Sequence, residues 1–184
     1  MYEICQGAPD DLSARPENEA AVYRFLNQLG IPFLRIDHDA VQTMEVCESI
    51  DRQLGGVICK NLFLCNQQKT VFYLLMLRED KAFKTKDISK QLGVSRLSFG
   101  TPEHMEQLLQ IHPGAVSPMG LLFESAKDVR LVMDKDLLND KELGCHPCVN
   151  TASIRLPMKA FLEVYLPATG HQPVFVSIPR LQQE

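Results

Sequence analysis

Two apolar segments joined by a short polar turn constrain the fold of this 184-residue chain most strongly. The segments are Val57–Cys65 and Val71–Leu77, and apolar runs of this length on both sides of a polar turn are typical of a β-hairpin. The first segment interrupts its own pattern, because Lys60 and Asn61 stand where a further aliphatic residue is expected. These two residues are either a feature of a sheet edge or the first sign of a functional site.

Lys60 has two interpretations. A lysine in a strand is typical of a sheet edge, where it discourages aggregation, or of a side chain that extends to water. The alternative is a pocket walled by the neighbouring aliphatic side chains, in which the ammonium group binds a phosphate, a carboxylate or a developing oxyanion. Asn61 points to the opposite face of a regular strand, so both side chains reach one ligand only if the strand is bulged or twisted there.

The remaining helix and strand patterns follow one another irregularly. The sequence has neither strict β-α-β alternation nor a Gly-rich phosphate loop, which disfavours the Rossmann and nucleotide-dependent kinase classes. No repeat or Gly/Ser linker divides the chain. We therefore predict one mixed α/β (α+β) domain over residues 1–184, with a curved, barrel-like mixed sheet and surrounding helices. Helices are expected at 18–30, 43–55, 85–93, 101–114 and 157–166, and further strands at 31–37, 128–134, 148–156 and 172–178.

The composition bears on location and partners. No window contains the roughly eighteen apolar residues of a membrane helix, and the polar N-terminus lacks a signal-peptide pattern, so we expect a cytoplasmic protein with no membrane partner. The six cysteines show no paired framework and are expected to be free thiols. The net charge of −4 argues against non-specific coating of nucleic acid, and no DNA partner is expected. A basic run from Arg78 to Arg96 either contacts a few phosphates or only faces solvent.

A second polar cluster, GCHPCVNTAS, spans residues 144–153. Cys145, His146 and Cys148 suggest a metal site at first, but no second Cys-x-x-Cys or His pair supplies the missing ligands, so no metal is expected. A Cys–His nucleophile pair is disfavoured, because neighbours in sequence seldom reach catalytic geometry. The polar members are better interpreted as hydrogen-bonding groups at a loop and a strand start, or merely as a capped strand end. They are His146, Asn150 and Thr151.

A third segment, GAVSPMGLL at Gly114–Leu122, forms either an ordinary turn or a tight loop whose backbone amides face a ligand. No segment is decisive alone, but their order is specific. KNLFL, GAVSPMGLL, VMDKDLL and HPCVNTASI follow one another as in the YbaK-like family of aminoacyl-tRNA editing domains, which the chain resembles from about Pro32 to Ile178. Within that family, KNLFL and the chain length look most like the stand-alone alanyl-tRNA(Pro) deacylases.

The resemblance implies a mixed α/β domain that hydrolyses the ester joining a wrong amino acid to the terminal adenosine of tRNA. The implied substrate is alanyl-tRNA(Pro), the implied partners are the acceptor end of that tRNA and prolyl-tRNA synthetase, and no cofactor is implied. By position, Lys60 matches the essential lysine of the family, and we expect it to bind the terminal adenosine and to stabilise negative charge. The expected substrate-binding residues are Asn61, Ser117, Gly120, His146, Asn150 and Thr151.

The implied reaction needs no metal or nucleotide, because an aminoacyl ester is already activated and requires only a placed water or ribose hydroxyl and donors for the oxyanion. Backbone amides of the Ser117–Gly120 loop are expected to hold the carbonyl oxygen. Lysine side chains are protonated at neutral pH and are poor general bases, so the terminal ribose or a water is expected in that role.

Three positions depart from the family pattern. Met119 stands where phenylalanine is commoner, Ala115 where serine is, and Cys148 where an aliphatic residue is. These changes bear on the size of the pocket and therefore on the preferred amino acid. Two other functions stay open: a binding module that keeps the pocket without hydrolysis, and a thiol-dependent hydrolase that acts through Cys145 or Cys148.

Overall fold

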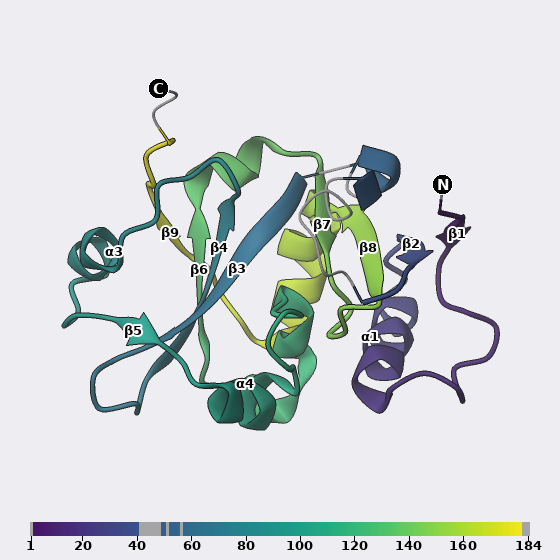
Figure 1. Cartoon of the computed structure of the whole chain (residues 1–184), viewed down its shortest axis with the longest axis horizontal. Coiled ribbons are helices and arrows are strands. Elements are labelled where there is room, and N and C mark those ends of the chain that lie inside the picture. Colours follow the sequence, from purple (N-terminus) through teal and green to yellow (C-terminus); the bar gives the residue numbers. More distant parts are fainter. Residues whose placement is uncertain (1, 41–48, 51, 56, 182–184) are drawn as a thin grey trace.

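The computed structural model describes residues 2–40, 49–50, 52–55 and 57–181. They form a mixed α/β fold around a strongly twisted sheet (Figure 1), which confirms the predicted fold class. The strands are β1 (Ile4–Gln6), β2 (Leu34–Asp37), β3 (Val57–Cys65), β4 (Phe72–Arg78), β5 (Ser98–Phe99), β6 (Arg130–Asp134), β7 (Glu142–Cys145), β8 (Ala152–Pro157) and β9 (Val174–Val176). The helices are α1 (Glu17–Gln28), α3 (Thr85–Leu92), α4 (Pro102–Leu109), α5 (Met158–Ala160) and α6 (Leu166–Thr169), with 3₁₀ turns η1 (Pro118–Leu122), η2 (Glu124–Ala126) and η3 (Lys135–Asn139) and a π-helical turn η4 (Phe161–Tyr165).

The sheet is open and separates into two halves at β3. Its strand order is β1-β2-β8-β7-β3-β4-β6-β9, with β5 on β3, and the outer strands β1 and β9 are not paired with each other. One edge of β3 pairs with β4 from Cys59 to Cys65. The other edge pairs with β7 as far as Ile58 and next with β5 at Leu64. Between these two points that edge has no partner strand among the described residues, and β3 runs diagonally away from β7 in Figure 1.

Alternating side chains of β3 face different hydrophobic clusters. Cys59 and Phe63 belong to the main core, which also contains side chains of α1, α4, β7 and β8. Leu62 and Leu64 belong to a second cluster that lies beneath α3. Because successive side chains of a strand point to opposite faces, Lys60 lies on the face of Leu62 and Leu64, away from the main core.

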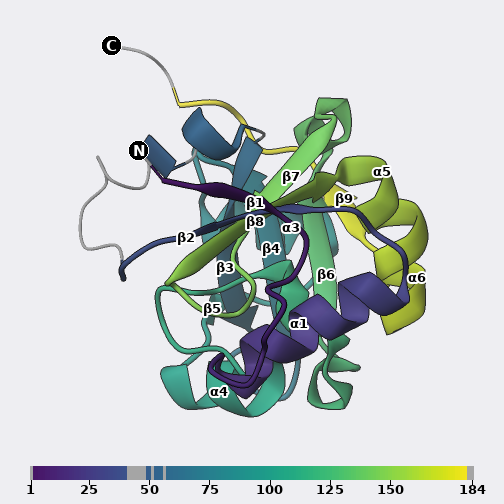
Figure 2. The same ribbon diagram turned by 90° about the vertical axis from the view of Figure 1, so that its right-hand side faces the viewer.

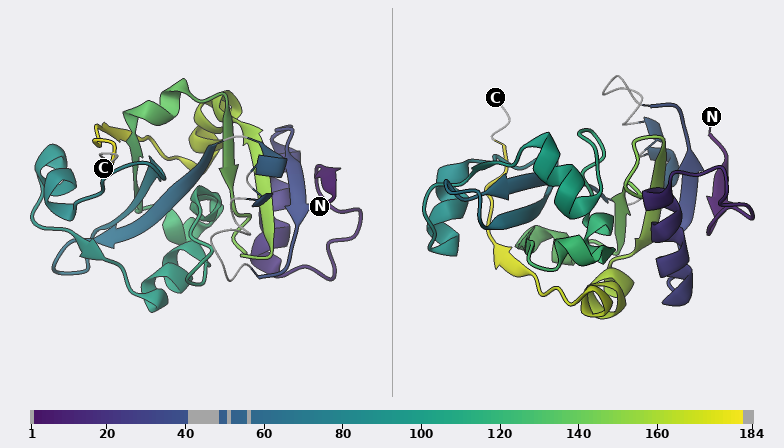
Figure 3. Two further views of the ribbon diagram at one scale, coloured as in Figure 1. Left: turned by 45° about the horizontal axis from the view of Figure 1, so that its top comes forward. Right: turned by 90° about the horizontal axis from the view of Figure 1, so that it is seen from below.

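Helices cover the main-core face of the sheet. Tyr23 of α1, Leu109 of α4 and Phe161 of η4 are fully buried in that core. Figure 2 shows α1 with α5 and α6 beside it, and the view from below in Figure 3 shows the same helices along one side of the strands. The opposite face carries the cluster beneath α3 and a third, smaller cluster that contains Ile36 and Leu54.

Helix ends follow the signals in the sequence. Thr101 caps α4 by accepting a hydrogen bond from the amide of His104, and Pro102 occupies the first turn. Gly93 ends α3 with φ of +65°, a conformation that favours glycine. The predicted helix over 43–55 is described only in part, at 49–50 and 52–54, where the chain is helical, and its other residues lie outside the described ones apart from Gly55.

Three strands were not predicted from the sequence, and one strand begins later than predicted. Strands β1, β5 and β7 have at most four residues each and show no readable alternation. The predicted strand over 148–156 begins at Ala152, because the preceding residues form a turn in which Cys148 has φ of +65°.

Cys5, Cys65, Cys145 and Cys148 are free thiols, whereas Cys47 lies outside the described residues. No helix of the described residues is long and apolar enough to cross a membrane.

Candidate functional site

The candidate site lies where β3 separates from β7. Ile58 of β3 pairs with Gly144 of β7. Lys60 and His146 each lie two residues beyond this last pair, just after the point where the two strands separate. Lys60 is exposed and makes no hydrogen bond or ion pair with any described residue. The ammonium group of Lys60, which has no partner among the described residues, and the imidazole of His146 therefore both follow the end of the β3–β7 pairing.

His146 is held as a neutral ring. Its Nδ1 lies 2.9 Å from the carbonyl oxygen of Ala152, which can only accept, so Nδ1 carries the proton. Burial lowers the pKa of His146 below its usual value of 6.5, the carbonyl of Ala152 opposes that shift and the neighbouring His38 adds to it. With the proton fixed on Nδ1, the Nε2 atom of the neutral ring keeps its lone pair and can accept a proton.

Two polar residues on the same face of the sheet, His38 and Ser153, were not identified from the sequence. The Nδ1 atom of His38 lies 2.9 Å from the carbonyl oxygen of Asp39, and its Nε2 atom lies 3.0 Å from the hydroxyl of Ser153. The rings of His38 and His146 are 6.3 Å apart between centroids. Both His38 and Ser153 are buried. A lone histidine after a strand gave no signal, because its serine partner lies 115 residues away.

Ser117 joins the glycine-containing loop to His146. Its side chain is fully buried; the hydroxyl donates to the carbonyl oxygen of His146 at 2.5 Å and accepts from the amide of Met119 at 3.1 Å. The amide of Gly120 donates to the carbonyl oxygen of Ser117 at 3.2 Å. We expected backbone amides of this loop to bind the carbonyl oxygen of the substrate. Few of these amides are free to do so, because most already donate within the loop and Pro118 has no N–H. In this loop only the amide of Ser117 lacks an acceptor among the described residues.

Gly120 is required by packing against α4. A Cβ atom at this position would lie 2.8 Å from a side-chain carbon of Ile111 and 2.9 Å from the carbonyl oxygen of Leu109. Tyr165 fixes the same loop from the other side, because its buried hydroxyl donates to the carbonyl oxygen of Met119 at 2.8 Å. The loop is thus rigidly held between α4 and η4.

The other predicted residues do not all share the face of Lys60. Asn61 is half-buried on the main-core face; its amide nitrogen donates to the carbonyl of Cys59 at 3.1 Å, and its Oδ1 atom is buried without a partner. The β3–β4 register is continuous through both residues, so Lys60 and Asn61 do point to opposite faces. Asn150 is half-buried beside Gly114. Thr151 is exposed, and its carbonyl oxygen accepts from the amide of His38 at 2.9 Å.

The cysteines near the site are poor nucleophiles. Burial raises the pKa of Cys145 to about 12 and raises that of Cys148 well above its usual value. The reactive form of cysteine is the thiolate, so neither thiol is ionised at neutral pH. Among the described residues, no group of three or more His, Cys, Asp and Glu side chains is arranged to hold a metal ion.

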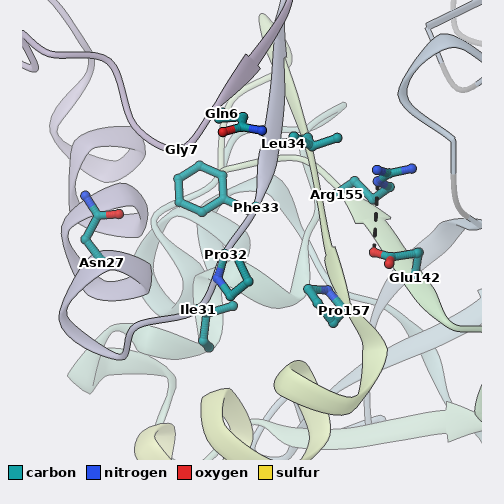
Figure 4. Close-up of a pocket in the computed structure, with 10 residues that line it drawn as sticks. All are labelled: Gln6, Gly7, Asn27, Ile31, Pro32, Phe33, Leu34, Glu142, Arg155 and Pro157. Carbon is teal, nitrogen blue, oxygen red and sulfur yellow. Dashed lines mark ion pairs between the residues drawn. The ribbon is translucent and has the colours of Figure 1, made fainter.

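A separate hollow of about 440 Å³ lies at the opposite end of the β7–β8 pair. Phe33 stands in its middle, and Arg155 and Glu142 approach each other to 3.9 Å at its rim (Figure 4). None of the residues predicted from the sequence lines it.

Comparison with known proteins decides the family. The model of the aminoacyl-tRNA editing domain matches residues 38–164. The chain belongs to this family. The matched segment begins at His38 and contains Lys60, Ser117 and His146.

Individual members of the editing family support the assignment along most of the chain. The prolyl-tRNA editing protein ProX of Acetoanaerobium sticklandii is 33% identical over 151 residues, which cover 82% of this chain and 92% of that protein. Prolyl-tRNA synthetase associated domain-containing protein 1 of Danio rerio is 30% identical, with 92% of this chain and 89% of that protein covered. A crystal structure described as that of a candidate trans-editing enzyme for prolyl-tRNA synthetase shares the fold, with a TM-score of 0.66 at 18% identity and coverage of 90% of this chain and 98% of that one.

Proposed function

We propose that residues 1–184 act as one domain that hydrolyses mischarged tRNA in trans, with alanyl-tRNA(Pro) as the substrate. The observation that carries the proposal is that Lys60, without a partner among the described residues, and His146, protonated on Nδ1, both follow the last β3–β7 pair in a chain of the editing family. The tRNA is the proposed partner, bound through its acceptor end, with prolyl-tRNA synthetase as a docking partner that would supply mischarged product.

The proposed reaction uses these two groups on opposite sides of the ester. A water attacks the carbonyl carbon of the alanyl ester and gives its proton to Nε2 of His146. Lys60 stabilises the negative charge that develops on the carbonyl oxygen, or on the phosphate and sugar beside it. The tetrahedral intermediate then releases the ribose oxygen, which takes the proton back from the imidazolium, and free alanine leaves. Ser117 orients His146 through its backbone carbonyl and does not touch the substrate.

Discrimination against the correct product is proposed to be steric. The single methyl group of alanine contributes only about 0.8 kcal/mol of binding. A pocket whose walls cannot move can exclude the larger proline ring much more sharply than that. Met119 and Gly120 are buried, and their loop is held by α4 and by the hydroxyl of Tyr165, so this loop would support such a wall from the core and would not itself touch the amino acid.

The direct test is deacylation of alanyl-tRNA(Pro), with prolyl-tRNA(Pro) and seryl-tRNA as controls. We expect release of alanine to exceed release of proline by at least about 100-fold in kcat/KM, the scale of discrimination that a rigid pocket achieves. Hydrolysis of none of the three substrates by the folded protein would overturn the proposal and favour a binding module that keeps the pocket without catalysis.

His146 sets the expected dependence of activity on pH. Only its neutral form accepts a proton, and burial lowers its pKa below 6.5. We therefore expect kcat/KM to lose no imidazole-dependent activity between pH 8 and pH 7, and to fall about tenfold per pH unit only once the pH has passed below that lowered pKa. His146→Asn keeps a donor for the carbonyl of Ala152 and should lose about 100-fold in rate together with this acid limb.

The exposed His112 provides a matched control, since His112→Asn should leave both the rate and the pH profile unchanged. An acid limb with its midpoint at or above pH 6.5, or one that persists in His146→Asn, would show that another group accepts the proton.

A further inference from the structure

A cleft of about 420 Å³ lies between α3 and β5. These two elements are on the left of the molecule in Figure 1. It is separate from the candidate site and lies further along β3. Its lining residues are Gln67, Thr85, Arg96, Leu97, Ser98 and Phe99.

The cleft presents an aromatic ring to solvent. Phe99 is 57% exposed, although it belongs to a paired strand and lies directly opposite Leu64 of β3. The ring of Phe83 contacts it edge-on at 6.1 Å between centroids, and the neighbouring amide of Gly100 donates to the carbonyl oxygen of Phe63 at 2.9 Å. Phe99 is thus a fixed backbone position with an exposed ring.

The surface around the cleft is positively charged. Arg96 lines the cleft, and Lys84 and Lys86 are exposed next to Thr85 in sequence. None of these three cations makes an ion pair with a described residue. Asp87 is the one acidic residue between positions 81 and 102 of a chain whose net charge is −4. A polyanion is therefore favoured here and disfavoured over the acidic remainder.

The geometry relates this cleft to Lys60. Lys60 and Leu64 lie on the same face of β3, and Phe99 shares that face because it is the cross-strand neighbour of Leu64. Four residues of a strand span about 13 Å. Lys60 and Phe99 therefore lie on one face of the sheet, and a ligand that joins them passes beside the buried Leu64 and need not cross the sheet.

We propose that the cleft between α3 and β5 binds the unpaired nucleotides that precede the terminal adenosine of the tRNA substrate, with a base stacked on Phe99 and a phosphate bound by Arg96. An exposed aromatic ring beside unpaired cations is the combination that binds single-stranded nucleic acid, because every base has a flat face and every linkage a charge. Gln67 and Ser98 offer hydrogen bonds to base edges or ribose hydroxyls. This inference rests on the proposed function only for the placement of the terminal adenosine at Lys60.

The test measures binding rather than hydrolysis. Fluorescence anisotropy would compare a labelled single-stranded RNA hexamer that ends in CCA with labelled adenosine monophosphate, for the wild type and for Phe99→Ala, Phe99→Trp and Arg96→Ala. We expect Phe99→Ala to weaken hexamer binding by about 5- to 100-fold, the range found when one stacked base loses its aromatic partner. Phe99→Trp should retain the affinity. Arg96→Ala should weaken binding and reduce the slope of log affinity against log salt by about 0.7, as for one lost phosphate contact on a single strand.

Two exposed residues on other elements provide the controls. Phe175→Ala on β9 removes another exposed ring, and Arg130→Ala on β6 removes another exposed guanidinium. Both should leave hexamer binding unchanged. Equal hexamer affinity in Phe99→Ala and the wild type would overturn the stacking proposal even if alanyl-tRNA(Pro) is hydrolysed normally, and loss of hexamer binding in Phe99→Ala would support it even if no hydrolysis is found.

Discussion

Replacing Lys60 with alanine is expected to reduce kcat/KM for alanyl-tRNA(Pro) by about 100- to 1,000-fold, the cost of removing a group that stabilises an oxyanion. The free energy of unfolding should change by no more than about 0.5 kcal/mol, because the side chain is exposed and has no partner among the described residues. Deacylation kinetics and urea denaturation of the same preparation measure both quantities.

The pair of results separates a catalytic lysine from an edge lysine. A lysine that only protects a sheet edge would leave kcat/KM unchanged when replaced. Lys60→Arg keeps the positive charge but replaces the compact ammonium group with a planar guanidinium, over which the charge is spread. We therefore expect Lys60→Arg to retain only part of the wild-type rate. Lys135→Ala, an exposed lysine on η3, should change neither quantity. A full rate in Lys60→Ala would remove Lys60 from the proposed mechanism.

The fold could be predicted from the sequence where patterns were long. The hairpin of β3 and β4 was recognisable because nine and seven residues of apolar pattern flank a polar turn. The short strands β5 and β7 were not, because their pairing depends on partners that are distant in sequence: β5 pairs with β3, and β7 joins β3 to β8. Strand β7 nevertheless decides the site, since its last pair with β3 lies two residues before both His146 and Lys60.

The chemistry of the site was harder to predict from the sequence than its location. The sequence indicated Lys60 and His146, but the protonation of His146 depends on a carbonyl oxygen six residues away and on burial. Likewise, the bond from Ser117 to the carbonyl of His146 spans 29 residues. Such contacts are properties of the folded chain and leave no periodic signal in it.

The basic run from Arg78 to Arg96 shows the same limit, because the structure divides it in two. Arg78 pairs with Asp140 at 3.1 Å, and Lys81 is buried against two carboxylates. Lys84, Lys86, Lys90 and Arg96 remain exposed. The charge that the sequence offers for nucleic acid is therefore carried by the second half of the run, and the first half stabilises the fold.

Replacing Lys81 is accordingly expected to destabilise the protein by about 3–5 kcal/mol, the cost of removing one partner from a buried ion pair. The side chain of Lys81 is only 2% exposed, and its Nζ atom lies 3.0 Å from Asp134, whose side chain is 1% exposed. It also donates to Asp136 and, at 2.9 Å, to the carbonyl oxygen of Ile178. Lys81→Met would leave the carboxylate of Asp134 charged, buried and unpaired. Urea denaturation of Lys81→Met against the wild type measures the loss.

A second substitution that also removes the charge of Asp134 separates the cost of an unpaired buried carboxylate from the cost of a packing defect. Lys81→Met combined with Asp134→Asn removes both charges of this buried pair, so the double variant should recover a large part of the loss, because the cost arises from the unpaired carboxylate and not from the missing attraction. Lys159→Ala is the matched control: its ion pair with Glu163 spans 3.8 Å between exposed side chains and should contribute less than about 1 kcal/mol. If Lys81→Met loses no more free energy of unfolding than Lys159→Ala, the buried ion-pair cluster does not stabilise the fold, and the first half of the basic run is open to another role.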